Sequence, residues 1–280
     1  MRTRIFNKMT APEVDEYLAR GGDTIVIAMG VVEVHGACPI DCETAAAEGM
    51  AIAMAEAMDG LAMVNLPYFY PGGTLSSPAT VHVTIRDGID YLMKICGSLA
   101  EQGFKRFYLT NGHGPSALTA NAFCREFFDE YRLQPCNIGM LNVQIKAMQT
   151  VGWKGDLDSM IVGAYKMMGQ LDFVPIDPNA EDARGEHQEI HPAMARFLKM
   201  CTKYSGYGST SQVFSDPRQH GGGRIYKSRE ELEAAADEGV KQLQSLVATV
   251  DFKAMNEALA EYQAYVVRTY EKYPRVAPKR

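Results

Sequence analysis

The sequence predicts an α/β fold in which a mostly parallel sheet carries helices on both faces. Short continuous apolar runs, such as residues 24–30 and 61–66, are typical of strands that are buried on both sides. Longer segments with the apolar spacing of helices lie between such runs, so strand and helix alternate along the chain. With 280 residues, of which 46% are hydrophobic, the chain can bury a sizeable core. We therefore expect one domain over residues 1–280.

The predicted elements follow a regular order through the first half of the chain. We expect strands over residues 24–30, 61–66, 106–110 and 137–143, and helices over residues 11–20, 43–58, 88–103, 116–131, 192–200, 228–250 and 252–273. Two less regular stretches, residues 148–185 and 205–226, contain glycine, aspartate and proline. They are expected to form loops and short helices of the kind that cover a binding site.

The charge and the cysteine content indicate which classes of partner and which compartment to expect. The formal net charge is -6, and the lysines and arginines are dispersed among acidic residues. This argues against nucleic acid or an anionic membrane as a partner and favours a small molecule. The six cysteines show no CxxC spacing, and we recognise no secretory leader and no apolar run of membrane-spanning length. We expect reduced thiols and a cytoplasmic protein.

Two pairs of possible metal ligands follow the first predicted strand. Glu33 and His35 stand two residues apart, which points both side chains to the same side of an extended backbone. Asp41 and Glu43 come next, at the start of an alanine-rich helix. Carboxylate and imidazole groups in one short stretch are typical of hydrolytic metal sites.

A second candidate group follows the predicted strand 106–110. Residues 111–114 read Asn-Gly-His-Gly, and the two glycines allow a tight turn and a close approach of the backbone to a ligand. In doubly wound sheets, ligands bind outside the carboxyl ends of the strands. We therefore expect His113 to lie near Glu33 and His35.

A third group of titratable side chains precedes the predicted helix 192–200. It contains Glu186, His187 and Glu189. Because the helix dipole favours acidic residues near the first turn of a helix, either glutamate can also be explained without a ligand role. A centre with two ions, however, needs more ligands than the first two groups supply, and this segment can supply them.

Six short motifs occur in the order and approximate spacing of the creatininase (creatinine amidohydrolase) family, which the chain resembles over nearly its whole length. The motifs are MGVVEVHG, PIDCETAAAE, SPATVHV, FYLTNGHGPS, GEHQEIH and VFSDPR. The resemblance implies a metal-dependent α/β hydrolase that forms homo-oligomers. It also implies two divalent ions per subunit, zinc or manganese.

The resemblance gives roles to individual residues. It makes Glu33 a ligand of one ion, His35 a ligand of the other, and His113 a further ligand. The carboxylate that bridges the ions corresponds to Glu43 if one residue is missing from the preceding loop. Asp41 is the rival for this role.

One family ligand is absent. Creatininase has a metal-binding glutamate two residues after the histidine of Asn-Gly-His, whereas this chain has Pro115. Glu189 or Glu186 is expected to supply the missing ligand. The resemblance also implies a proton donor in this segment, for which His187 is the candidate, and Glu189 is grouped with it as a catalytic residue.

The substrate is expected to contact three further residues. Thr80 ends the sequence Pro-Ala-Thr, which replaces the family motif Pro-Gly-Thr. Trp153 lies in a segment comparable to the substrate-covering loop of the family. Asn111 precedes the Gly-His pair of the second candidate group.

These roles predict a hydrolase that uses a metal-activated water to open a small cyclic polar substrate. Our preferred substrate is an oxidised inositol, 3-dehydro-scyllo-inosose, opened by C–C hydrolysis in inositol catabolism. The preference rests on Pro115 and on the shortened loop 36–39, which depart from creatininase itself. The alternative is hydrolysis of a C–N bond in a cyclic amide such as creatinine. A third hypothesis is a non-catalytic subunit that binds a metal or a sugar-like ligand.

Overall fold

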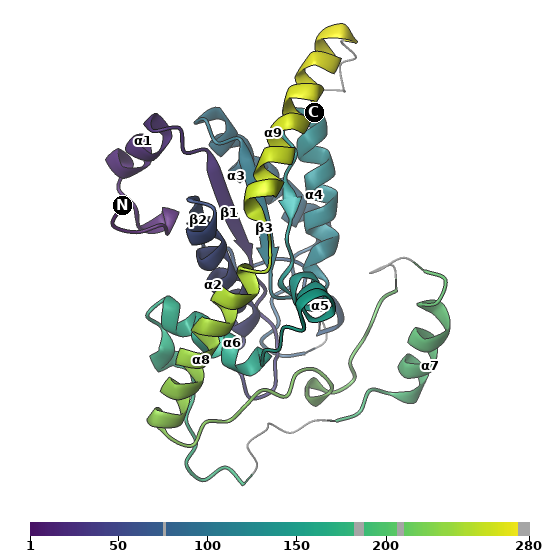
Figure 1. The fold of residues 1–280 in the computed structure, drawn as a ribbon. Helices are drawn as coiled ribbons and strands as arrows, with labels where there is room; N and C mark the ends of the chain where they lie inside the picture. The colour runs from purple at the N-terminus through teal and green to yellow at the C-terminus, as the bar shows by residue number, and fades with distance from the viewer. Residues whose placement is uncertain (75–76, 182–187, 206–209, 274–280) are drawn as a thin grey trace.

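A computed structural model describes residues 1–74, 77–181, 188–205 and 210–273, which form a parallel sheet with helices on both faces (Figure 1). The strands are β1 (Thr24–Met29), β2 (Leu61–Met63), β3 (Arg106–Asn111) and β4 (Cys136–Asn137). The α-helices are α1 (Ala11–Ala19), α2 (Cys42–Ala57), α3 (Ile85–Glu101), α4 (Ser116–Tyr131), α5 (Met140–Val151), α6 (Leu157–Met167), α7 (Pro192–Cys201), α8 (Arg229–Val247) and α9 (Phe252–Lys272). Short 3-10 turns occur at η1 (Phe6–Lys8), η2 (Gly72–Thr74), η3 (Leu171–Phe173) and η4 (Pro217–Gln219). Among these helices, none combines the length and the apolar composition needed to cross a bilayer.

The strand order in the sheet is β2-β1-β3-β4, and all neighbouring strands are parallel. The central strand β1 is buried at every position, as its apolar sequence predicts. From β1 the chain first crosses to one side to form β2 and then to the other side to form β3. The order therefore reverses at β1, and such a switch point is where open α/β sheets bind ligands, beyond the carboxyl ends of the strands.

Alternate residues of the strands enter two separate apolar cores. Val26 and Ala28 of β1 belong to the core that includes α2, α5, α6 and α8. Ile25 and Ile27 belong to the opposite core, with residues of α1, α3 and α4. This alternation follows from the period of two in an extended chain and confirms the prediction of helices on both faces of the sheet.

Helix α2 lies in the first of these cores with almost every residue from Cys42 to Ala55 buried. Its alanines and Gly49 let neighbouring elements approach closely, since a side chain on Gly49 would collide with Ala164 of α6. A helix that is apolar on all sides belongs inside the protein. The tight packing fixes the first turn of α2, where Glu43 stands.

One predicted element is wrong. Of the expected strand 137–143, only the first residue is in β4, and helix α5 begins at Met140 directly after Gly139. A short apolar run fits a buried strand or a buried helix equally well. The buried residues of α5, Met140, Val143 and Ala147, recur at intervals of three and four, which is helical spacing.

Part of the described chain between α6 and α8 lies away from the layered body (Figure 1). In it, α7 stands apart from the sheet, and none of its residues is buried. The helix itself agrees with the prediction over residues 192–200. Beyond α7 the chain returns toward the carboxyl end of the sheet and contributes the turn η4.

Candidate metal centre

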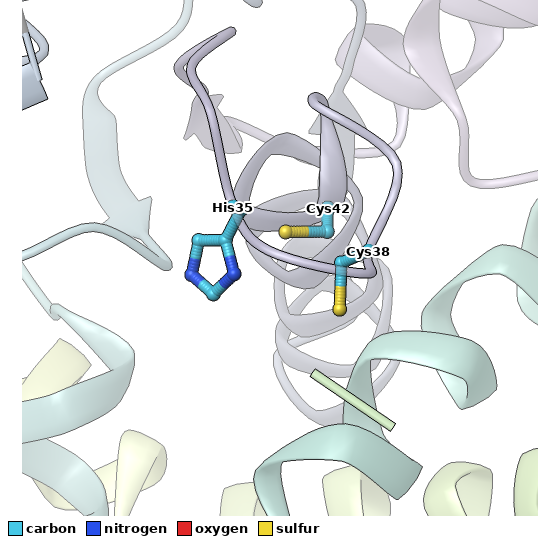
Figure 2. A group of neighbouring side chains, drawn as sticks. All are labelled: His35, Cys38 and Cys42. Carbon is cyan, nitrogen blue, oxygen red and sulfur yellow. The ribbon is translucent and has the colours of Figure 1, made fainter. Parts of the chain in front are cut away.

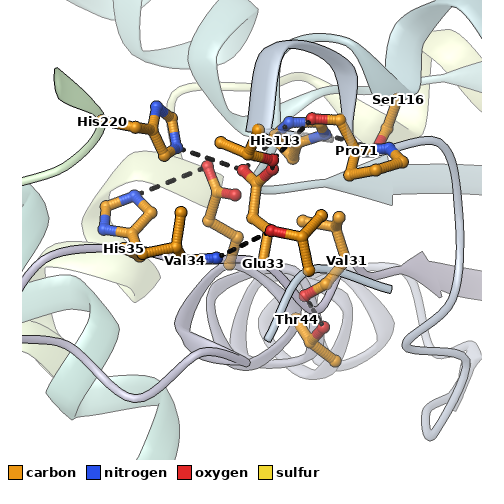
Figure 3. A network of polar contacts seen from close by, with 12 residues as sticks. Val31, Glu33, Val34, His35, Thr44, Pro71, His113, Ser116 and His220 are labelled. Carbon is orange, nitrogen blue, oxygen red and sulfur yellow. Dashed lines mark hydrogen bonds and ion pairs between the residues drawn. The ribbon is translucent and has the colours of Figure 1, made fainter. Parts of the chain in front are cut away.

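Glu33 and His113 meet beyond the carboxyl ends of β1 and β3. Both side chains are buried, with 1% and 3% of their surface exposed. His113 Nε2 lies 3.3 Å from Glu33 Oε1, and His113 Nδ1 lies 3.0 Å from the hydroxyl of Ser116 in the first turn of α4 (Figure 3). The parallel pairing of β1 and β3 thus brings the first two sequence groups together, as predicted.

Two further side chains contact the Glu33 carboxylate. The hydroxyl of Thr74, in η2, donates a hydrogen bond to Glu33 Oε2. On the other oxygen, His220 Nε2 lies 3.1 Å from Glu33 Oε1 (Figure 3). The ring of His220 also stacks on Phe214, with ring centroids 5.4 Å apart. Glu33 is therefore the most heavily contacted carboxylate of the site.

Sequence reasoning missed His220, although a local signal stands beside it. The residue directly follows η4, whose N-cap Asp216 accepts a hydrogen bond from the Arg218 amide. The motif SDPR, already part of the resemblance, marks this turn. After the turn, Gly221 packs against the His35 backbone so closely that a side chain there would collide with it.

Glu43 and His35 complete the cluster. Glu43 is the second residue of α2, and its Oε1 lies 3.8 Å from His35 Nε2. The rings of His35 and His220 meet edge to face, with centroids 5.0 Å apart. The loop after His35 is fixed by a hydrogen bond of 3.0 Å from the Ala37 amide to the Gly222 carbonyl oxygen.

The ligand atoms fall into two groups that share one residue. Glu33, Glu43 and His113 form one group, and His35, Glu43 and His220 form the other; within each group the ligand atoms lie within 4.8 Å of one another. Asp41 belongs to neither, because its carboxylate accepts a hydrogen bond from the hydroxyl of Tyr165. Of the two rival carboxylates, the structure thus brings Glu43 into both groups.

The electrostatics of the two carboxyl groups suit a bound cation. Burial by itself raises the pKa of Glu33, but hydrogen bonds with His113 and His220 outweigh it and hold this pKa well below its usual range. Burial and the neighbouring Glu33 carboxylate raise the pKa of Glu43 well above its usual range. Two carboxyl groups buried side by side repel each other when both are ionised, and a cation between them removes that repulsion.

An unpartnered oxygen at the cluster also fits a metal. Within the described part of the chain, Glu43 Oε2 is buried and has no hydrogen-bond partner. Buried polar atoms normally have a partner. Carboxylate oxygen and imidazole nitrogen are the donors that zinc and manganese accept.

A cavity of about 510 Å³ opens onto the cluster. Glu43, His113 and His220 form part of its wall, and the rest comes from the segment around η2, the start of α4 and the chain after α7. The lining residues in the described ranges are Glu43, Tyr70, Pro71, Gly72, Gly73, Thr74, His113, Gly114, Pro115, Leu118, Thr202, Ser205, Thr210, Ser211, Gln212, Phe214 and His220. A cavity of this size can hold a small polar molecule beside the cluster.

The three predicted substrate-binding residues lie outside this lining. Trp153 packs at the edge of the core, and its Nε1 donates a hydrogen bond of 3.0 Å to the Ser245 hydroxyl on α8. Its contact with the substrate stays a prediction. Thr80 Oγ1 accepts a hydrogen bond of 3.3 Å from the Val34 amide, between the two ligands of the first group. Asn111 Nδ2 bonds to the Asn137 side chain at 3.3 Å, which ties β3 to β4.

Of the three residues in the third sequence group, the structure describes one. Glu186 and His187 lie outside the described residues. Glu189 is exposed and belongs to none of the ligand groups formed by the described residues, and its ligand role stays a prediction. Its backbone carbonyl oxygen instead accepts a hydrogen bond of 3.0 Å from Gln219 Nε2 and so fastens the turn before His220.

Comparisons with known proteins agree with this arrangement. A family model described as creatininase, creatinine amidohydrolase, matches residues 7–191. A search of curated proteins finds no match.

Three solved structures are similar to the chain. Creatininase in a form named for Mn is 17% identical, with a TM-score of 0.58 over 88% of this chain and 98% of that one. A glutamate-to-glutamine creatininase variant of the Zn-Zn type is 15% identical, with a TM-score of 0.56 over the same shares.

The third structure is a protein of Bacteroides fragilis NCTC 9343, provisionally assigned as a creatinine amidohydrolase. It is 19% identical, with a TM-score of 0.58 over 88% of this chain and 96% of that one. At these identities the likeness concerns the fold. The family model matches well over half of the sequence and includes four of the five clustered ligands, all except His220. This chain belongs to the creatininase family.

Proposed function

We propose that this protein is a metal-dependent hydrolase that opens a small cyclic polar substrate in the cavity beside Glu43. The observation that carries the proposal is the pair of ligand groups that share Glu43 at the cavity wall. Family membership supports a metal-dependent hydrolase as well. Neither line of support depends on the identity of the substrate.

The two groups offer places for two divalent ions. One ion would be held by Glu33, Glu43 and His113, and the other by His35, Glu43 and His220. Zinc and manganese are the proposed ions, because the donor atoms are carboxylate oxygens and imidazole nitrogens. The similar creatininase structures named for Zn and Mn support the same choice.

A divalent ion in this centre supplies Lewis-acid activation of water and of a carbonyl group. The protein positions the ligands for that chemistry. Thr74 holds one oxygen of Glu33 by a hydrogen bond, and Ser116 fixes the ring of His113 at 3.0 Å. Such outer contacts keep ligand side chains in one orientation and preserve their protonation state. The cavity that opens onto the cluster would receive the substrate.

The family description favours a C–N bond in a cyclic amide as the bond that is cleaved. Water would add across the bond between the carbonyl carbon and the ring nitrogen, which yields a carboxylate and an amine. The centre needs a group to protonate the departing nitrogen. The proton donor expected from the sequence, His187, lies outside the described residues, and His220 is kept here as a metal ligand.

A second candidate function is hydrolysis of a C–C bond in an oxidised inositol. Two features of the cavity wall favour it. Thr202, Ser205, Thr210, Ser211 and Gln212 give the wall neutral hydrogen-bonding groups that suit a polyhydroxylated ring. In addition, Pro115 lies in the wall, at the position where creatininase has a charged glutamate.

Substrate assays on the metal-loaded full chain test the proposal. Creatinine and an oxidised inositol are incubated separately, and the ring-opened acid is measured in each case. Acid from creatinine alone supports C–N hydrolysis, and acid from the inositol alone supports C–C hydrolysis. The Glu43→Gln variant serves as the control and should form neither acid. If the unsubstituted protein binds a substrate but opens no ring with either metal, the non-catalytic hypothesis replaces the proposal.

A further inference from the structure

A second cluster of metal-binding side chains lies on the far side of His35 from Glu43. The ligand atoms of His35, Cys38 and Cys42 all lie within 4.8 Å of one another (Figure 2). Cys42, the first residue of α2, is fully buried, and Cys38 is partly buried in the preceding loop. Thiolate sulfur and imidazole nitrogen together are the donors of many zinc sites.

The backbone fixes the two sulfur atoms in place. The Cys38 amide donates a hydrogen bond of 3.1 Å to the His35 carbonyl oxygen, and the Cys42 amide donates one of 3.0 Å to the Pro39 carbonyl oxygen. Gly223 approaches the Cys38 sulfur so closely that a side chain at this position would displace it. Two turns and the packing of Gly223 therefore hold the two sulfur atoms in place. An ion could bind there without a large rearrangement of the chain.

His35 points a different ring nitrogen toward each cluster. Its Nε2 faces Glu43 at 3.8 Å. Its Nδ1 is buried, has no hydrogen-bond partner among the described residues, and lies on the side of the ring that faces the two thiols (Figure 2). The Cys38 thiol interacts with His35 on one side and with Cys42 on the other. An ion at this place would replace these weak thiol contacts by bonds to all three side chains.

We propose that His35, Cys38 and Cys42 form a second cation site, which takes a thiophilic ion such as Zn²⁺ or Cd²⁺. The three side chains supply two sulfur ligands and one nitrogen ligand, and the fourth position of a tetrahedral ion is left for water. Soft sulfur donors separate this site chemically from the carboxylate-rich centre at Glu33 and Glu43. The two sites share one imidazole, and a neutral imidazole offers a lone pair on only one of its nitrogens, so neutral His35 serves one of the two sites at a time.

Cadmium titration of the reduced, metal-free full chain tests the site, because Cd–thiolate bonds absorb in the ultraviolet. We expect this absorption to saturate at one equivalent of Cd²⁺. Cys38→Ser and Cys42→Ser should each weaken binding by about tenfold or more, the scale of a lost ligand or supporting contact. Cys136→Ser and Cys201→Ser are the matched controls and should retain the signal. Circular dichroism checks that each variant is folded. Cys38 is partly exposed, so its substitution should disturb the core less than substitution of the buried Cys42.

The Glu43→Gln variant distinguishes the thiol site from the proposed hydrolytic centre. It should lose ring-opening activity and keep the Cd–thiolate absorption. Absence of the absorption, or its persistence in both Cys38→Ser and Cys42→Ser, would overturn the thiol site and leave the hydrolase proposal intact. Loss of the absorption in Glu43→Gln without loss in Cys38→Ser would also overturn it.

Discussion

His220 Nε2 lies 3.1 Å from Glu33 Oε1, although the two residues are 187 positions apart in the sequence. This contact joins the end of β1 to the chain that returns after α7. It also brings a second imidazole to a carboxylate that already contacts His113 at 3.3 Å. The candidate centre is thus closed by a segment that the family model does not include.

Replacing His220 tests this closure. His220→Ala should lower both metal affinity and catalytic efficiency by about 10- to 100-fold, because it removes a candidate ligand and a contact of Glu33. Metal binding is measured by calorimetry and activity by ring opening. His191→Asn is the control: His191 caps α7 by accepting from the Ala193 amide at 3.2 Å, and asparagine preserves a cap. Equal losses in both variants would contradict a specific role for His220.

The shared position of Glu43 makes a prediction about metal-dependent stability. A ligand that binds only the folded state at 100 times its Kd adds about 2.7 kcal/mol to the free energy of unfolding. Glu43→Gln should lose most of the rise in Tm that zinc or manganese produces, because the residue belongs to both ligand groups. Asp41→Asn should keep it, since asparagine retains the oxygen that accepts from Tyr165. The reverse result would make Asp41 the bridging residue.

The sequence could predict those residues of the site that directly follow a predicted strand, and it could not predict those that reach the site through a long connection. Glu33, His35 and His113 follow predicted strands, and parallel pairing alone brings strand ends together. The SDPR motif beside His220 marks a turn, but it does not show that His220 meets Glu33, because that contact depends on the path of the chain between α6 and α8. The substrate-covering role of Trp153 comes from the resemblance alone and stays a prediction, and the structure adds its contact with α8.

Thr74 should matter to activity more than to folding. Its hydroxyl donates to Glu33 Oε2, and hydrogen bonds to charged groups contribute about 1.5–3 kcal/mol. Thr74→Val keeps the shape of the side chain without the donor, so kcat/KM should fall by about tenfold or more. Thr74→Ser keeps the hydroxyl and should restore most of the activity. Equal activity of the valine and serine variants would show that the hydroxyl does not orient Glu33.

Replacing Glu48 by glutamine should stabilise the protein at neutral pH but not at low pH. The residue is 4% exposed, its Oε1 accepts a hydrogen bond of 2.6 Å from the Asn65 amide, and burial raises the pKa of Glu48. A carboxyl with a raised folded-state pKa stabilises the fold only while it is protonated, so this contribution is lost as the pH rises from the unfolded pKa through the folded one. Glu48→Gln keeps the acceptor and never ionises.

The variant should therefore match the unsubstituted protein in stability below the ordinary pKa of glutamate and exceed it at neutral pH. Urea unfolding of both proteins at several pH values measures the difference. A gain that is the same at every pH would mean that ionisation of Glu48 is not its cause.

Packing between α6 and α8 gives the last prediction. A side chain on Gly239 would collide with the Ser159 carbonyl oxygen, and one on Gly163 would collide with the backbone of Gly239. Because both obstacles are backbone atoms, they cannot move aside as a flexible side chain would. Gly239→Ala should cost at least about 3 kcal/mol, the upper end of overpacking effects. Glu238→Ala, at the exposed neighbouring position on α8, should change stability by no more than about 0.5 kcal/mol.

Helix α6 carries Tyr165, which bonds to Asp41 before the first turn of α2. The Gly239 variant should therefore also weaken metal binding at Glu43, whereas a destabilised variant with unchanged metal affinity would separate this helix packing from the geometry of the centre.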